Sequence, residues 1–136
     1  MRSRTPTVLF AVGVLLLAGC ASICTSVATA DKATNEVNCG IAIAQWIDAN
    51  AVVPLIPVAT GSTLKAITAY HAALPAMIDA TLTGLAAYEA GTIKDYKAVL
   101  GLLVTFYENI AKVIVEAGQP DPLANAKAAA TAGTLK

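Results

Sequence analysis

The sequence predicts an all-α protein, and three observations indicate this fold class. Apolar residues recur at intervals of three and four in three separate segments, the spacing that places them on one side of a helix. None of these segments shows the alternation with a period of two that is typical of strands. Glycine and proline stand between the segments, where helices end. We therefore expect a small bundle of three main helices, at about 35–50, 62–90 and 92–117, followed by a short C-terminal helix.

The first helix is expected to begin near Asn35 and to end near Asn50. Its apolar positions are spaced by three and four: Val37, Ile41, Ala44 and Ile47. The apolar run that follows, 52–58, contains Pro54 and Pro57, and proline cannot donate a hydrogen bond to a helix or a sheet. We expect this run to be an extended segment that lies across the bundle.

The second helix is expected to start at Ser62 as its N-cap and to stop at Gly91. One side carries larger residues: Leu64, Ile67, His71, Leu74, Ile78, Leu85 and Tyr88. The opposite side, here called the small-residue stripe, consists of Ala66, Ala69, Ala73, Ala76, Ala80, Thr83, Ala87 and Ala90. A helix that is apolar on two sides is typically packed between two neighbours, so we expect both sides to be covered.

The third helix is expected to be capped by Thr92, with Asp95 completing a capping box. Its apolar residues continue at intervals of three and four: Ile93, Tyr96, Leu100, Leu103, Tyr107, Ile110, Ile114 and Ala117. Gly118 ends this helix, and Asp121-Pro122 opens the short alanine-rich helix that follows.

The first twenty residues have the order of an export signal. Arg2 and Arg4 are followed by an apolar run and then by Leu17-Ala18-Gly19-Cys20. These last four residues resemble the lipobox of bacterial lipoproteins. The resemblance implies that the signal is cut before Cys20, that the Cys20 sulfur carries a diacylglycerol, and that the new amino group is acylated.

This resemblance divides the chain into a lipoprotein signal peptide at 1–19, a lipidated tether at 20–33 and a helical domain at 34–136. Ala21 stands where an aspartate would resemble the inner-membrane retention signal of Gram-negative lipoproteins. We therefore expect a lipid-anchored protein of the cell envelope, attached in a Gram-negative host to the outer membrane and facing the periplasm.

The chain has three cysteines, and lipidation of Cys20 leaves Cys24 and Cys39. In an oxidising compartment these two can form a disulfide, and two free thiols are the alternative. A metal site is not expected, since acylated Cys20 cannot be a ligand and the closely paired spacing of zinc ligands is missing.

Charge limits the partners of the mature chain. Removal of Arg2 and Arg4 leaves seven basic residues against nine acidic ones, a net charge of about −2, and the basic residues are scattered. Nucleic-acid binding, which needs clustered Lys and Arg, is not expected. The expected partners are the membrane, through the acyl chains on Cys20, and a protein partner or a second copy of the chain.

No grouping of residues indicates an enzyme, and no cofactor is expected. Ser62 and Lys65 have the Ser-x-x-Lys spacing of penicillin-binding proteins, but the Ser-Asp-Asn and Lys-Thr-Gly motifs of that family are missing. His71, the single histidine, is expected to be packed in the bundle or in an interface. The aromatic residues are expected in the core rather than along a binding groove: Trp46, Tyr70, Tyr88, Tyr96 and Tyr107.

These observations favour a membrane-anchored lipoprotein with a non-catalytic interaction or structural role. The alternative is a membrane-active helical protein, because only His71 and Asp79 are strongly polar between Lys65 and Glu89. Short, alanine-rich lipoproteins of this kind are similar to some encoded by phages and prophages, a group in which lysis and phage exclusion are known roles.

Overall fold

The computed structural model describes residues 32–133, and every element in this range is helical. The predicted all-α fold is therefore confirmed. The expected signal peptide and all but the last two residues of the expected tether lie outside the described residues.

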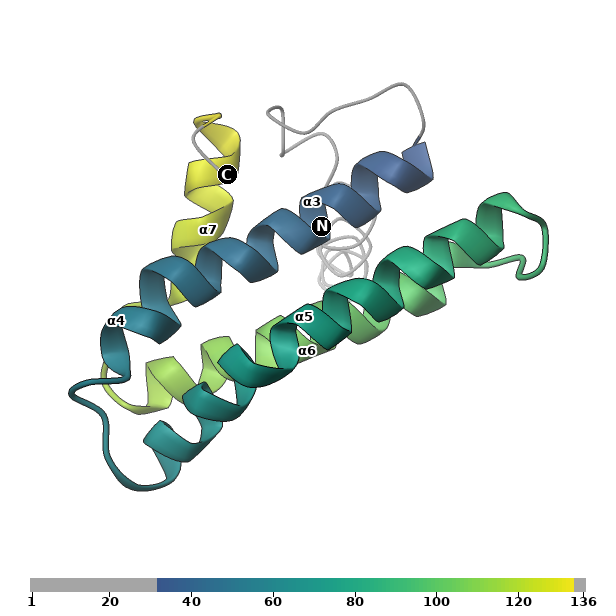
Figure 1. Cartoon of the computed structure of the whole chain (residues 1–136). Coiled ribbons are helices and arrows are strands. Elements are labelled where there is room, and N and C mark those ends of the chain that lie inside the picture. Colours follow the sequence, from purple (N-terminus) through teal and green to yellow (C-terminus); the bar gives the residue numbers. More distant parts are fainter. Residues whose placement is uncertain (1–31, 134–136) are drawn as a thin grey trace, which may run out of the picture.

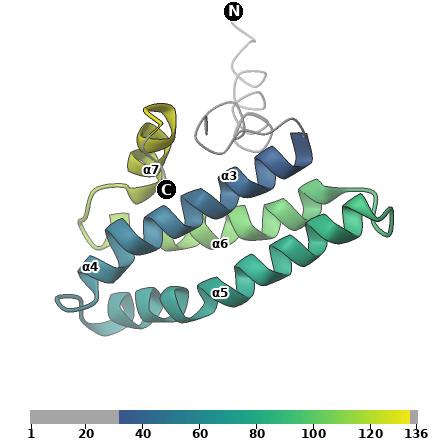
Figure 2. The same cartoon turned by 45° about the horizontal axis from the view of Figure 1, so that its top comes forward.

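Two long helices form an antiparallel pair. α5 (Gly61–Glu89) and α6 (Tyr96–Glu116) lie side by side and are joined by a short connection (Figure 1). α3 (Lys32–Ile47) packs against both, and α7 (Pro122–Thr131) packs against α3 and α6. Figure 2 shows α3 between α7 and the α5–α6 pair. The core therefore surrounds α3.

α3 is buried far more completely than its predicted apolar stripe requires. Six consecutive residues have buried side chains or backbone: Cys39, Gly40, Ile41, Ala42, Ile43 and Ala44. A helix that is buried on nearly all sides is typical of the centre of a fold, whereas a surface helix keeps one polar face. The predicted helix at 35–50 exists, but it is the central element of the domain.

Two glycines let neighbouring helices approach closely. A Cβ atom on Gly40 would lie 2.9 Å from Cδ1 of Leu100, and one on Gly84 would clash with both Cγ atoms of Val99. Gly40 thus sets the distance between α3 and α6, and Gly84 sets the distance between α5 and α6. Leucine can turn its terminal methyl away, but valine is held in one rotamer in a helix, so the α5–α6 contact is the less adaptable of the two.

The prediction of an extended segment at 52–58 is wrong. The chain leaves α3 through the π-helical turn η2 (Asp48–Val52) and continues into the short helix α4 (Val53–Leu55). Pro54 stands in the first turn of α4, where a backbone N–H has no partner within the helix, so its missing donor costs little. The Val53 N–H bonds to the Asp48 carbonyl, five residues back, which carries the helical path through the turn.

Two predicted caps are also wrong. Thr60, not Ser62, is the N-cap of α5, and its side chain makes no capping hydrogen bond. Asp95, not Thr92, caps α6, and its carboxylate accepts a 2.9 Å hydrogen bond from the Lys97 N–H. Asp95 caps the helix by itself, because its side chain accepts the hydrogen bond from the second helical residue. Thr92 lies in the connection between α5 and α6.

The predicted helix ends are confirmed at Gly91 and Gly118, which have φ angles of +79° and +86°. After α5 the Thr92 N–H bonds to the Ala87 carbonyl at 2.9 Å, and the Gly91 N–H bonds to the Tyr88 carbonyl at 3.0 Å. This double hydrogen bond around a left-handed residue is the Schellman arrangement that closes a helix. The short C-terminal helix begins at Pro122, as expected.

A glycine pair tests the close approach of α5 and α6. Gly84→Ala should destabilise the domain by about 1–3 kcal/mol, because the added methyl group meets Val99 in a packed contact. Gly101→Ala on α6 is the matched control: its Cβ would meet nothing within 4 Å, so it should stabilise the helix by about 0.5–1 kcal/mol. Urea unfolding followed by circular dichroism measures both. Equal effects of the two substitutions would contradict the close approach.

Candidate functional site

A groove lies where the end of α3 meets the start of α7. It has a volume of about 330 Å³. One wall comes from the end of α3, from η2 and from the residues around α4, and the other comes from the end of α6, the α6–α7 connection and α7. The lining residues are Trp46, Asn50, Ala51, Pro54, Leu55, Val58, Ile114, Gln119, Pro120, Pro122 and Asn125.

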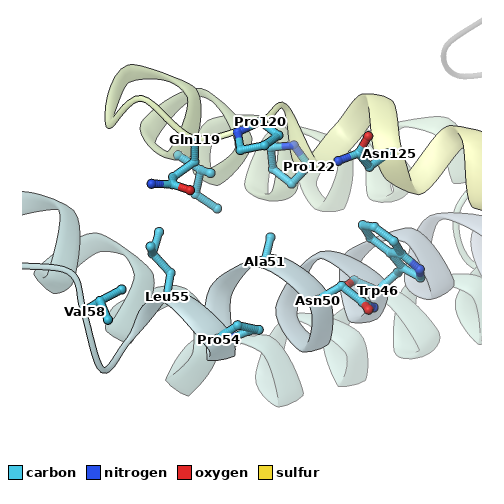
Figure 3. Close-up of a pocket in the computed structure, with 11 residues that line it drawn as sticks. Trp46, Asn50, Ala51, Pro54, Leu55, Val58, Gln119, Pro120, Pro122 and Asn125 are labelled. Atoms are coloured by element: carbon cyan, nitrogen blue, oxygen red, sulfur yellow. The ribbon is translucent and has the colours of Figure 1, made fainter.

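Local sequence fixes both walls of this groove. The π turn and α4 extend the helical path of α3, so that one row of side chains continues from Trp46 to Leu55. On the opposite side, Asp121 caps α7 by accepting a 3.0 Å hydrogen bond from the Leu123 N–H, and Pro122 occupies the first helical position. Figure 3 shows these two rows of side chains facing each other.

The groove is lined by apolar and amide side chains, with no charged residue among them. Three carboxamides lie along it: Asn50, Gln119 and Asn125. The Asn50 Nδ2 donates a 3.0 Å hydrogen bond to the Trp46 carbonyl, which holds this carboxamide beside the indole. Each carboxamide group carries both a donor and an acceptor. The groove is thus suited to an uncharged ligand that has both apolar and hydrogen-bonding parts.

The aromatic residues are divided between core and groove. Tyr70, Tyr96 and Tyr107 are buried, as predicted, and Tyr88 is half-buried. Trp46 is half-buried and packs against the core like Tyr88, and it differs from the tyrosines in that it also lines the groove. Helical spacing alone could not separate it from the others, because Trp46 stands beside the apolar stripe of α3 in the sequence.

Glu36 is a buried carboxyl that the sequence did not reveal. It lies in α3 within five residues of the start of the helix, and its side chain is fully buried. Its Oε1 accepts a 3.0 Å hydrogen bond from the Tyr96 hydroxyl, and its Oε2 has no hydrogen-bond partner. Burial of a carboxyl that lacks a hydrogen-bond partner on one oxygen is costly. Loss of the Tyr96 hydroxyl would add to that cost, so the contact between α3 and α6 is sensitive to substitution of either residue.

His71 is not packed in the bundle, so the first of its two predicted places is wrong, and a place in an interface stays a prediction. Its side chain is 52% exposed, and its Nδ1 lies 2.9 Å from Oδ2 and 3.0 Å from Oδ1 of Asp48. The two residues are 23 positions apart in the sequence, so only the path of the chain through η2 brings them together. Their contact ties the middle of α5 to the π turn.

Tyr70 makes a second link between α5 and α3. Its hydroxyl donates a 2.8 Å hydrogen bond to the Ala44 carbonyl, and its ring stacks on Phe106 with the ring centroids 4.4 Å apart. Burial, and to a smaller extent the negative charge of Asp48, raises the pKa of Tyr70 well above its ordinary value. The hydroxyl therefore stays protonated and keeps donating to α3 at alkaline pH values where an exposed tyrosine ionises.

The cysteines are only partly covered by the described residues. Cys39 is buried in α3 and is disulfide-bonded. Cys20 and Cys24 lie outside the described residues. Lipidation of Cys20 and pairing of Cys24 with Cys39 therefore stay predictions.

The Ser-x-x-Lys spacing at Ser62 and Lys65 lies on the exposed first turn of α5, where both residues face solvent. Asp79 is also exposed. Within residues 32–133, no group of three or more His, Cys, Asp or Glu side chains is placed to hold a metal ion.

Within the described chain most of the small-residue stripe of α5 is not covered by another helix, and its cover by a second copy of the chain stays a prediction. The core of the domain lies on the opposite side of α5, where Ile67, Leu74 and Leu85 are buried. Most of the stripe is exposed: Ala69, Ala73, Ala76, Ala80, Thr83 and Ala90, with Ala66 and Ala87 half-buried. One side of α5 is thus packed by the domain, and the side that carries the stripe is presented at its surface.

α6 is the one described helix that is long and apolar enough to cross a membrane. The sequence had instead drawn attention to the span of α5. In α6, 39% of the most apolar window is buried inside the domain, including Leu100 and Leu103. A core helix passes the same criterion of length and composition, so this finding does not distinguish the two roles.

Comparison with known protein families, with curated protein sequences and with solved structures finds no match to this chain.

A double-mutant cycle tests the buried pair of Glu36 and Tyr96. Tyr96→Phe removes the hydrogen bond to a buried carboxyl and should cost about 1–3 kcal/mol of stability. Combining it with Glu36→Met should cost less than the sum of the single changes, because both polar partners are then replaced by apolar groups. Urea unfolding of the four proteins gives the coupling. Tyr88→Phe, on the ring that contacts Tyr96 edge-on, is the control. Additive effects at residues 36 and 96 would show that the bond does not stabilise the fold.

Proposed function

We propose that this protein is a membrane-anchored lipoprotein, acylated on Cys20, with a non-catalytic interaction or structural role at the cell envelope. The observation that carries the proposal is the sequence order of the first twenty residues, which ends in Leu17-Ala18-Gly19-Cys20. The apolar run of about half the length that a bilayer needs favours a cleaved signal over a permanent span.

The helical domain supports this role through the surfaces that it exposes. The small-residue stripe is an uncharged surface, and a helix of small residues lets another helix approach closely. We propose this face as the contact with a protein partner or with a second copy of the chain. In the mature protein the acyl chains supply the membrane affinity, at about 0.8 kcal/mol per buried CH₂, so the domain itself does not need to insert.

A membrane-active role is the second candidate: α6 has the length and the apolar composition of a membrane span, properties that it shares with a core helix. Insertion of α6 would take Leu100, Leu103 and Ile114 out of the core, where each is at most 1% exposed. The energetic cost of that loss supports the anchored interaction protein as the first choice.

Acylation is tested by Cys20→Ser. The substitution removes the sulfur that carries the lipid, so acyl labelling should be lost and the protein should no longer partition into detergent. Cys24→Ser is the matched control and should be labelled like the natural chain. Unchanged detergent partitioning of the Cys20 variant would contradict the proposal, and retention in the membrane fraction without labelling would favour the membrane-active role.

The contact face is tested by placing leucine on the stripe. Ala80 is exposed, so Ala80→Leu should change the stability of the domain by less than about 0.5 kcal/mol. It should nevertheless weaken the association captured by crosslinking in the native membrane, because leucine separates closely packed helices. Ala86→Leu, also exposed on α5 but outside the stripe, is the control. If the two variants crosslink equally, the stripe is not the contact face.

A further inference from the structure

Two charged residues stand on the exposed side of α5, on a surface that is otherwise uncharged. Lys65 and Asp79 are both exposed, and the only other Lys, Arg, Asp or Glu of α5 is Glu89 at its C-terminal end. Within residues 32–133, neither Lys65 nor Asp79 takes part in an ion pair. Four exposed alanines lie between them: Ala69, Ala72, Ala73 and Ala76. This face of α5 therefore presents one positive and one negative charge, and the domain itself pairs neither of them.

The spacing of the two charges follows the spacing of the small-residue stripe. Lys65 directly precedes Ala66 of the stripe, and Asp79 directly precedes Ala80. The two charges are fourteen residues apart, nearly four turns, so both lie along the same edge of the stripe, about 21 Å from each other. In paired helices, charges that flank a small or apolar seam in this way set which partner binds and in which orientation.

This arrangement is self-complementary. A two-fold axis that crosses α5 beside Ala72 brings Lys65 of one copy to the level of Asp79 of a second copy, and the same operation makes the reciprocal pair. The two helices are then antiparallel, and both pairs form along one edge of the contact. A parallel arrangement would instead keep opposite charges about 21 Å apart. The charges of α5 thus fit an antiparallel copy of the same helix.

The alanines between the charges fit the same arrangement. Ala69 and Ala73 of one copy lie beside Ala73 and Ala69 of the other, and the distance between packed helices depends on the side chains at their contact. With the axis beside Ala72, the two helices overlap over residues 61–83, about 33 Å. An exposed ion pair adds little affinity, so the packed seam holds the copies together and the charges select the orientation.

The position of α3 is compatible with anchoring of both copies in one membrane. His71 lies beyond Lys65 and Asp79 on the same side of the stripe, and it contacts Asp48 at the end of α3. Figure 2 shows α3 along the length of α5. The two-fold axis keeps α3 of both copies on one side of the helix pair. Confinement to one membrane raises the effective concentration of the second copy, so a modest contact is sufficient.

We propose that α5 binds α5 of a second copy of this chain as an antiparallel pair, with Lys65 of each copy opposite Asp79 of the other. The proposal deepens the proposed function, since it rests on the role of the chain as an anchored interaction protein. It names the partner of the exposed face of α5 and the orientation of that partner.

Exchange of the two charges tests the pairing. The experiment measures energy transfer between full, acylated chains that carry a donor or an acceptor at the C-terminus, in phosphatidylcholine vesicles. Lys65→Glu alone or Asp79→Lys alone sets like charges opposite each other at both pairs, so association should weaken at least about fivefold. The double variant Lys65→Glu/Asp79→Lys should associate like the natural chain. Lys97→Glu, an exposed lysine of α6 beyond the overlap, is the matched control.

Cysteine crosslinking tests the orientation. Ala72→Cys places a thiol at the two-fold axis, where it meets its own counterpart, so a short bismaleimide should join the two copies. Ala80→Cys is the control, because in the antiparallel pair the two thiols are about 24 Å apart along the axis, whereas a parallel pair would bring them together. The natural chain gives the background of the native cysteines, and circular dichroism checks that each variant is folded.

Four results would overturn the proposal. These are no energy transfer above that of a monomeric anchored protein, equal association of Lys65→Glu and Lys97→Glu, no recovery in the double variant, and crosslinking of Ala80→Cys as efficient as that of Ala72→Cys. Acyl labelling of the same samples separates failure of the pairing from failure of the anchor. If the copies do not pair while Ala80→Leu still weakens capture of a different protein, this proposal fails and the contact face of the proposed function stands.

Discussion

The fold depends on one packing constraint: α3 must fit between α7 and the α5–α6 pair with almost no free side. Small residues make this possible. At Gly40 the α3 backbone comes so close to α6 that a Cβ atom would lie 2.9 Å from Leu100. A helix packed this tightly makes many dispersion contacts per residue, and it also transmits any change in side-chain volume to all its neighbours. The positions of the other helices follow from the diameter of α3.

Two buried hydroxyl groups set the position of α3 along its own axis. Tyr96 of α6 donates to Glu36, and Tyr70 of α5 donates to the Ala44 carbonyl. Apolar contacts are non-directional, so they specify the position of a helix along its axis less sharply than hydrogen bonds do. A hydrogen bond at each of two points, eight residues apart, makes such a shift expensive, because it would leave buried polar groups without partners. These two hydrogen bonds therefore favour one position of α3 along its axis, and they also stabilise the fold.

The sequence predicted the features of the fold that depend on local periodicity. The apolar spacing located the long helices. Gly91 and Gly118 located two helix ends, because glycine readily adopts the left-handed conformation that ends a helix. The path at 52–58 was mispredicted because Pro54 excludes a helix only where its N–H would be needed. The contact of His71 with Asp48 and the burial of Glu36 depend on which elements become neighbours. No local pattern contains that information.

The groove was beyond local prediction for the same reason. Its two walls are more than fifty residues apart in the sequence, and they meet only because α7 returns to pack on α3. Trp46 could be recognised as a candidate, but its neighbours Gln119 and Asn125 carry no motif of their own. The α6–α7 connection is uncharged apart from Asp121, whose carboxylate caps α7.

The exposed apolar surfaces of the domain differ in the size of the groups that they expose. The stripe on α5 is made of alanine and threonine, which expose little apolar area per residue while no partner is bound. It needs a partner helix along much of its length before the contact becomes favourable. The groove concentrates larger groups, Trp46, Leu55 and Val58, in a short concave site. Small residues and concave sites both limit non-specific association while no partner is bound.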